Sequence, residues 1–284
     1  MLFLIALFAL AAGCSSVRFT YNQGDTLLYW WLNAYVDLEG DQSTKARQNI
    51  EDFFQWHRKT QLRDYAGMLS KIQRQLAGTP TQADLMADYR EIRVRTETMA
   101  SHAAPQIAEL ALSLAPDQIA QMEKRFKSKN DDYRRKVLPS DPEKRQKARY
   151  KKSMEQFELW FGSFSREQEA VLRKASDARP TSDGEIMLEE RIWRQRKISG
   201  LLRKIQQEKP GKEGATALVS STLREMLNRT ESPERKVFYD AYADSTVKYL
   251  LTAIRIATPA QKAHAQKRMQ GWIEDFNVLA TEAK

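Results

Sequence analysis

The 284-residue sequence is poor in the residues that build many functional sites: it has one cysteine, three histidines, 11 glycines and nine prolines. A single cysteine excludes a disulfide framework within the chain, so the fold must rely on packing. None of His57, His102 and His264 has another His or Cys three or four residues away. The sequence therefore predicts no zinc-type metal site.

Catalytic motifs are missing as well. There is no G-x-S-x-G, no Walker-type phosphate loop and no H-E-x-x-H. Ser245–Lys248 matches S-x-x-K, but its companion motifs K-T-G and S-D-N do not occur. Acidic pairs such as Glu51–Asp52 are adjacent rather than converging, which is typical of solvated helix faces. We expect no catalytic site and no cofactor, and an envelope enzyme is the least favoured alternative.

Strand signals are also lacking, since there is no Asn-Gly hairpin turn and no sustained alternation of apolar and polar residues. Apolar residues instead recur at steps of three and four, as in Leu85, Tyr89 and Ile92. That period indicates a buried helical stripe. We predict an all-α fold of about nine amphipathic helices in an elongated antiparallel bundle. No break is long enough for an interdomain linker, so residues 27–284 are expected to form one helical domain.

Residues 1–13 are uncharged and almost wholly apolar, and Cys14 follows them directly. Crossing a membrane takes about 20 such residues, so this run has the length of a signal-peptide core. The sequence "AAGC" that ends at Cys14 resembles a bacterial lipobox, although Ala11 stands where Leu is usual. The resemblance implies a signal peptide over 1–13, a lipidated Cys14 and a short tether over 14–26. The alternatives are a plain signal peptide or a buried helix with an incidental Cys.

The residue after Cys14 bears on the address of the protein. In enteric bacteria, an Asp at that position retains a lipoprotein in the inner membrane, whereas this chain has Ser15. By that resemblance we expect a lipid-anchored protein on the outer membrane of a Gram-negative bacterium, facing the periplasm. Several acyl chains give firm attachment because each buried methylene adds about 0.8 kcal/mol.

The segment over residues 17–40 is rich in aromatic residues and has few charges. Trp30, Trp31 and Tyr35 would suit a lipid interface, where such rings are favoured. The spacing of Leu27, Trp30, Trp31, Ala34 and Leu38 instead favours a stripe that packs into the core as the first helix. We expect the packed arrangement and keep the interfacial one as the alternative.

Similar four-residue openings recur along the chain. Pro at the first helical position, Ser or Thr as cap and Gln three residues later are features of a capping box, so we interpret the openings as helix starts. They are Thr79–Gln82, Ala115–Gln118, Ser165–Gln168, Ser232–Arg235 and Thr258–Gln261, with further S-x-x-E matches at Ser140–Glu143 and Ser182–Glu185.

Positive charge is concentrated between Lys124 and Lys152, where 13 Lys and Arg face four Asp and Glu, an excess equal to the +9 of the whole chain. The stretch spans a predicted helix-turn-helix about Leu138–Pro142, so both arms could present one basic tip. A field of this kind attracts anions and is screened by salt. The alternative is that these side chains only solvate long helices. The candidate anion- or partner-binding residues are Lys124, Arg125, Lys127, Lys129, Arg134, Arg135, Lys136, Lys144, Arg145, Lys147, Arg149, Lys151 and Lys152. A second basic group is Arg191, Arg194, Arg196, Lys197, Arg203 and Lys204.

Two resemblances bear on function. "LAPDQ", "FSREQ" and "ATPAQ" resemble the L-T-x-x-Q motif of Spy/CpxP-type periplasmic helical proteins, which act as chaperones and stress regulators. The lipobox together with "YNQGDTLLYWWLNAYVDL" and "FFQWHRKTQLRDYAGML" resembles an uncharacterised lipoprotein family of proteobacteria, a domain of unknown function. That resemblance implies a cellular location and no activity.

These observations favour a non-catalytic binding or chaperone-like role. The expected partners are the membrane, through the anchor, and anionic lipid, lipopolysaccharide or protein clients, through the basic surface; no nucleic acid is expected in a periplasmic protein. The alternative is a structural scaffold subunit of an envelope assembly, whose contact surface would be aromatic rather than charged.

Overall fold

The computed structural model describes residues 15–138, 141–179, 183–228 and 233–282. Within these ranges all regular structure is helical, which confirms the all-α prediction. Cys14 and the expected signal segment 1–13 lie outside the described residues, as do Ser140, Ser182 and Ser232. The helices are α2 (Ser15–Asn22), α3 (Gly24–Val36), α4 (Gly40–Thr60), α5 (Leu62–Ala77), α6 (Gln82–Ser113), α7 (Pro116–Val137), α8 (Pro142–Phe161), α9 (Arg166–Asp177), α10 (Asp183–Glu208), α11 (Lys212–Asn228), α12 (Pro233–Ile256) and α13 (Pro259–Thr281).

The described ranges hold 12 helices, so the predicted number of about nine is too low. The apolar run from Ile50 to Leu76 is divided at Gln61 into α4 and α5. The apolar pattern did not reveal this break, because the same stripe continues on both sides of it. The short α9 has too few apolar residues to show a clear period, and α2 falls in the expected tether. No helix in these ranges is both long and apolar enough to span a membrane.

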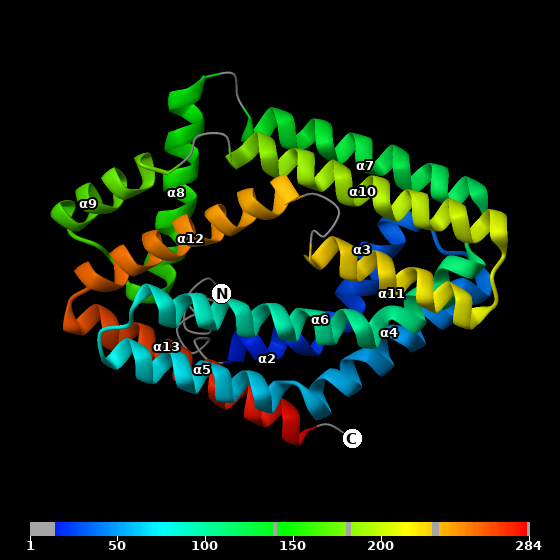
Figure 1. Ribbon diagram of the computed structural model, residues 1–284. Helices are drawn as coiled ribbons and strands as arrows, with labels where there is room; N and C mark the ends of the chain where they lie inside the picture. The colour runs from blue at the N-terminus through cyan, green and yellow to red at the C-terminus, as the bar shows by residue number, and fades with distance from the viewer. Residues whose placement is uncertain (1–14, 139–140, 180–182, 229–232, 283–284) are drawn as a thin grey trace, which may run out of the picture.

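Three pairs of neighbouring helices make the most extensive contacts: α5 with α13, α6 with α11, and α7 with α10. Figure 1 shows α7 and α10 running together along one side of the molecule, while α5 and α13 lie on the opposite side. The 32-residue α6 runs between these layers. It also contacts α4, α10 and α12, and so connects most of the fold.

The buried apolar residues form two main clusters that meet on α6. In the first cluster, Ala104, Ala108 and Ala111 of α6 pack with Ala215 and Val219 of α11. These small side chains let the two helices approach closely. The second cluster joins Leu85 near the start of α6 to α5, α8, α9, α12 and α13. Opposite ends of one helix are therefore built into different parts of the core.

Two of the predicted helix starts are complete capping boxes. The hydroxyl of Ser165 accepts from the backbone N–H of Gln168, and the Gln168 side chain accepts from the N–H of Ser165 at 2.9 Å. Thr258 and Gln261 make the same pair of bonds at the start of α13. Ala115 has no capping side chain, but its N–H still donates to Gln118 at 2.9 Å. These three openings are thus structural devices that begin helices.

Two expected starts are displaced. The cap of α6 is Thr81 rather than Thr79, and its partner is Asp84, whose carboxylate accepts from the N–H of Thr81 at 2.8 Å. A carboxylate is the better group there because the helix N-terminus carries partial positive charge. At α8 the cap is Asp141 rather than Ser140, and its carboxylate accepts from the N–H of Glu143 at 2.9 Å.

Helix α2 is fixed to distant parts of the chain. On α2, Arg18 pairs with Asp275 of α13 at 3.0 Å, and the Tyr21 hydroxyl lies 2.7 Å from Nδ1 of His57. Burial raises the pKa of the Asp275 carboxyl, and the nearby Arg18 guanidinium opposes that rise. The segment expected to be a tether is therefore largely helical and lies against α13.

The prediction that α3 buries its tryptophan stripe is wrong. Trp30 and Trp31 are 60% and 59% exposed, and Leu27 and Ala34 are exposed as well; of the predicted stripe only Leu38, which follows the end of α3, is buried. The buried residues of α3 are Tyr29 and Val36, on the opposite side of the helix. The guanidinium of Arg47 on α4 covers the Tyr29 ring at 3.5 Å from its centroid. Both faces of α3 are apolar, so periodicity alone could not decide which one packs.

Candidate functional site

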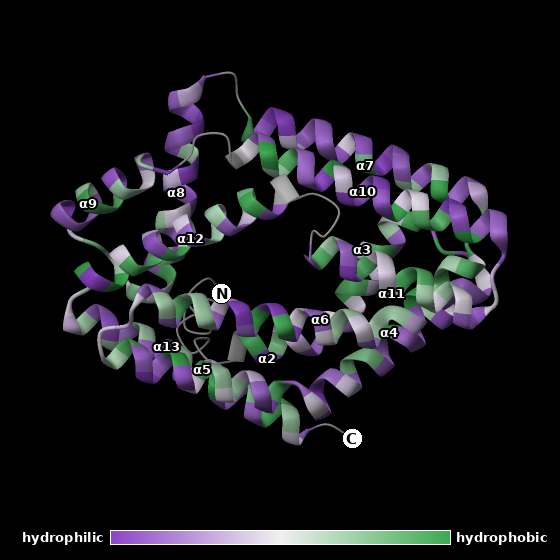
Figure 2. Ribbon diagram, viewed as in Figure 1, coloured by the Kyte–Doolittle hydropathy of each residue, from purple (hydrophilic) through white to green (hydrophobic). Residues whose placement is uncertain are grey.

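The basic stretch lies on α7 and α8, which diverge from their connection at residues 138–141 (Figure 1). Helix α7 packs on α10 and α3, whereas α8 packs on α13 and α9. Figure 2 shows both helices as largely hydrophilic. The basic side chains therefore lie on two helices that pack against different neighbours, and not on the two closely paired helices of a hairpin.

Five of the 13 candidate cations are engaged with nearby groups. Arg134 pairs with Asp131 at 2.8 Å, Arg135 pairs with Asp132, and Lys144 lies 3.9 Å from Asp141.

Two of these five cations join α8 to other helices. Arg145 reaches Glu185 of α10 at 3.1 Å, and Arg149 donates to the carbonyl of Ser176 at 2.8 Å. Arg145 and Arg149 therefore have a structural role in addition to any binding role.

The other eight make no ion pair or side-chain hydrogen bond with any residue that the structure describes. Seven of them are exposed, and Lys129 is half-buried. Their charge is therefore available to an anionic partner. They are Lys124, Arg125, Lys127, Lys129, Lys136, Lys147, Lys151 and Lys152.

The second basic group on α10 is mostly neutralised within the fold. Arg203 binds Glu123 of α7 through two nitrogens, at 3.0 and 2.6 Å, and its guanidinium lowers the pKa of that carboxyl. Lys197 pairs with Glu225 of α11 at 2.6 Å. These ion pairs hold α10 against its neighbours, so they point to structure more than to binding.

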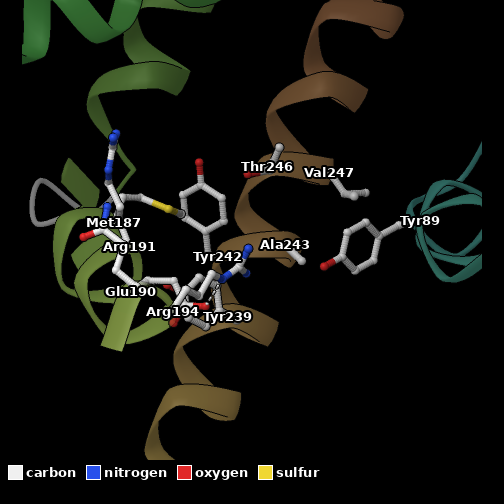
Figure 3. A pocket seen from close by; sticks show the side chains of 11 residues that line it. Tyr89, Met187, Glu190, Arg191, Arg194, Tyr239, Tyr242, Ala243, Thr246 and Val247 are labelled. Carbon is white, nitrogen blue, oxygen red and sulfur yellow. Dashed lines mark hydrogen bonds and ion pairs between the residues drawn. The ribbon is translucent and has the colours of Figure 1, made fainter. Parts of the chain in front are cut away.

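A cavity of about 470 Å³ opens where α6, α10 and α12 meet, and it was not predicted from the sequence. Figure 3 shows Tyr89 extending from α6 toward α12, and Met187 extending from α10 toward the ring of Tyr242. The α10 and α12 residues each recur at helical spacing, which on its own only marks a helix face. The lining residues are Tyr89, Met187, Glu190, Arg191, Arg194, Gln195, Tyr239, Tyr242, Ala243, Thr246 and Val247.

The cavity has a wall that is mostly apolar, with a few charged side chains. Its charged groups are already engaged: Glu190 is buried and pairs with Arg194 at 2.8 Å, and the Arg191 guanidinium lies 6.0 Å from the centroid of the Tyr133 ring. The side chains named as its lining include no His or Cys. What remains is an apolar, tyrosine-rich wall.

Two of the three histidines belong to aromatic packing, whereas Nδ1 of His264 lies 2.9 Å from the carbonyl oxygen of Trp160. His57 lies among Tyr21, Phe53 and Tyr65, and burial lowers its pKa to about 4. His102 stacks on Trp56, with ring centroids 3.7 Å apart. Among the described residues, no group of three or more His, Cys, Asp or Glu side chains is placed to hold a metal ion.

A family model matches residues 34–231, which is more than half of the chain. The chain belongs to the DUF6279 family, a family of unknown function. This membership agrees with the expected domain of unknown function, and it shows neither a lipoprotein nor a Spy/CpxP-type protein. No curated protein and no solved structure matches the chain.

The DUF6279 match contains the basic stretch and only part of the cavity wall. It extends from the second half of α3 to the end of α11, and so includes the whole basic stretch on α7 and α8. Helices α12 and α13 lie outside it. The cavity of this DUF6279 member is therefore built partly from residues beyond the family match. The eight cations without a partner among the described residues all lie within the match.

Proposed function

We propose that this DUF6279 member is a non-catalytic, lipid-anchored periplasmic protein that binds anionic envelope components through its basic α7–α8 surface. The observation that carries the proposal is the set of eight cations that have no partner among the described residues. A protein that used these charges only for its own stability would be expected to pair more of them, as α10 does. Phosphate groups of phospholipid or lipopolysaccharide are the favoured partners, because they are the densest anions at a membrane surface.

The attachment part of the proposal rests on Cys14 and the apolar segment before it. Acylation of Cys14 would hold the chain at the membrane, and the outer membrane is the favoured address because Ser15 follows it. Substituting Cys14 by Ser should release the protein from the membrane fraction. Continued fractionation with membranes would count against lipidation.

The binding part is tested with charge reversals and vesicles. A chain that starts at Ser15 is sedimented with vesicles containing phosphatidylglycerol, at low and at physiological salt. Changing Lys147, Lys151 and Lys152 to Glu should weaken binding by more than about tenfold, since each cation near an anionic surface contributes about 1 kcal/mol. Added salt should weaken the binding of the parent chain as well.

The matched control reverses three exposed lysines on other helices, Lys45, Lys59 and Lys212. It changes the net charge by the same amount, so it separates the α8 surface from an effect of overall charge. Equal loss in the two variants, or no binding by the parent at low salt, would defeat the lipid proposal. If the protein does not bind vesicles but suppresses the aggregation of client proteins in a salt-sensitive way, the basic surface binds acidic proteins and not lipid.

The scaffold alternative has one observation in its favour. The aromatic side chains of Trp30 and Trp31 are 60% and 59% exposed on α3. Exposed apolar side chains of this kind suit contact with another protein. A stoichiometric partner that is captured from crosslinked envelopes and is insensitive to salt would favour the scaffold role.

A further inference from the structure

Helix α3 has two apolar faces, and the part of the chain that the structure describes buries only one of them. Its 13 residues include one charged side chain, that of Asp25. Tyr29 and Val36 are buried against the neighbouring helices, whereas Trp30 and Trp31 are exposed on the other side. A helix that is apolar all round is normally buried all round. The second face of α3 therefore requires a further occupant.

The exposed face is a continuous stripe. Leu27, Trp30, Trp31 and Ala34 lie at positions i, i+3, i+4 and i+7, which place them on one side of the helix. Of the 12 large apolar side chains that are exposed in the described residues, five fall between Phe19 and Trp31. Scattered exposed apolar residues are normal, but a concentration of this size marks an interaction site.

The place of this stripe in the chain identifies the occupant. Cys14 comes directly before α2, and α2 has eight residues, a length of about 12 Å. The first turn of α3 is therefore held close to the point where the proposed anchor enters the membrane. Tryptophan, with an apolar ring and one N–H donor, is enriched at the level of the lipid headgroups.

Charge near the stripe suits the same occupant. The rings of Trp31, Tyr35 and Phe126 form a chain of contacts from α3 to α7, with centroids 5.1 and 5.6 Å apart. Arg125 and Lys129 flank Phe126 on α7, and neither has a partner among the described side chains. Apolar rings beside free cations are the combination that binds a membrane surface.

We propose that the exposed face of α3, formed by Leu27, Trp30 and Trp31, lies in the headgroup region of the membrane that holds Cys14. This inference rests on the proposed membrane attachment. It adds an orientation: α3 faces the bilayer, so the anchored domain is held in one pose instead of swinging on a flexible tether.

The test uses Cys14 as a chemical handle, since it is the only cysteine. A chain starting at Cys14 is coupled to a maleimide-bearing lipid in phosphatidylcholine vesicles, so attachment does not depend on biological acylation. Tryptophan fluorescence is compared between vesicles with and without brominated acyl chains, at high salt. The parent protein should be quenched by brominated lipid. The variant Trp30→Phe/Trp31→Phe should lose that quenched component, because its remaining four tryptophans lie elsewhere.

The readout separates this inference from the anion-binding proposal. Neutral lipid and high salt silence the basic surface, so the fluorescence reports on the apolar face alone. Equal fractional quenching in the parent and the variant, or no quenching in either, would overturn the inference and leave the α8 charge test standing. Concentration-dependent dimers with unquenched tryptophans would assign the face to a second copy of the chain, which also overturns it.

A partition assay supplies a second readout. Without the coupled lipid, Trp30→Ala/Trp31→Ala should weaken binding to phosphatidylcholine vesicles by about tenfold. The matched control Ile92→Ala/Val94→Ala removes exposed apolar surface from α6 and should bind like the parent. An equal loss in both variants would contradict a specific role for α3. Circular dichroism checks that each variant keeps its helices.

Discussion

The side-chain amides of Gln42 and Gln118 bind each other in both directions. The Gln118 amide donates to Gln42 Oε1 at 2.8 Å, and the Gln42 amide donates to Gln118 Oε1 at 3.0 Å. Each also donates to a carbonyl at the C-terminal end of another helix, Gln118 to Asp37 after α3 at 2.8 Å and Gln42 to Ser113 of α6 at 2.6 Å. The pair thus joins the starts of α4 and α7 to the ends of α3 and α6.

Gln118→Ala is expected to lower the free energy of unfolding by about 2 to 3 kcal/mol. Gln118 is buried, and its loss leaves the Asp37 carbonyl and the Gln42 amide without that partner. Urea denaturation measures the change. Gln121→Ala on the same helix is the control: this exposed side chain makes one long contact, 3.5 Å to Asp37, so less than about 0.5 kcal/mol should be lost. Equal losses would show that the amide pair adds little.

The same arrangement recurs between Gln168 and Gln261, whose amides lie 2.9 and 3.2 Å from each other's oxygens. A double-mutant cycle with Gln168→Ala and Gln261→Ala should give a coupling energy of about 0.5 to 3 kcal/mol, because each variant disrupts the same contact. Gln118→Ala with Gln261→Ala joins residues of different pairs and should be additive. Additivity within the first cycle would contradict a direct stabilising bond.

Stability should fall between about pH 6.5 and pH 4. Burial lowers the pKa of His57 to about 4 and also lowers the pKa of His102, so the fold favours their neutral forms. The unfolded chain takes up these protons below about pH 6.5, which stabilises it relative to the fold. The loss due to His57 should be about 1 to 2 kcal/mol, allowing for solvent screening of the half-buried ring.

Urea denaturation at pH 7, 5.5 and 4.5 measures this loss. His57→Gln should flatten the profile, because the variant lacks the imidazole whose pKa burial lowers in the folded state. The raised pKa of the Asp275 carboxyl acts in the opposite sense, because its protonation favours the folded state. A flat profile for the parent protein would contradict the assignment to His57.

Two glycines should respond in opposite ways to alanine. A Cβ at Gly24 would lie 2.6 Å from the Phe54 ring, so Gly24→Ala is expected to cost about 1 to 3 kcal/mol. A Cβ at Gly67, inside α5, would meet nothing within 4 Å, so Gly67→Ala should stabilise the protein by about 0.5 to 1 kcal/mol. Thermal unfolding of the two variants tests the pair. A stabilised Gly24→Ala would show that Phe54 can move aside at little cost.

Local chemistry made part of the fold predictable. Ser165 and Thr258 were recognised as caps because a capping box depends on residues within one turn of helix. The start of α4 was missed because Glu39 is not a typical cap, although Gln42 fills the same role as Gln118 and accepts from the Glu39 N–H at 3.2 Å. The mutual binding of the glutamines was not predictable, because it joins residues 76 and 93 positions apart.

The candidate site also has features that the sequence predicts and features that depend on the tertiary structure. The density of positive charge from Lys124 to Lys152 was visible in the sequence, but the pairing of Arg145 with Glu185 depends on where α10 lies. The cavity went unseen because its wall combines three helices that are distant in the sequence. The number of charges can be read from the sequence, whereas the pairing of each charge and the walls of a cavity depend on how the helices pack.

The sequence by itself determined the helical class, the starts of α7, α9 and α13 and the concentration of charge, since helical period, capping and net charge are set by residues within a few turns. Only the tertiary structure decided which face of α3 is buried, which cations remain free and how the glutamine amides pair. Each of these depends on competition among distant partners: α4 and α7 cover Tyr29 and Val36, and so leave Trp30 and Trp31 exposed.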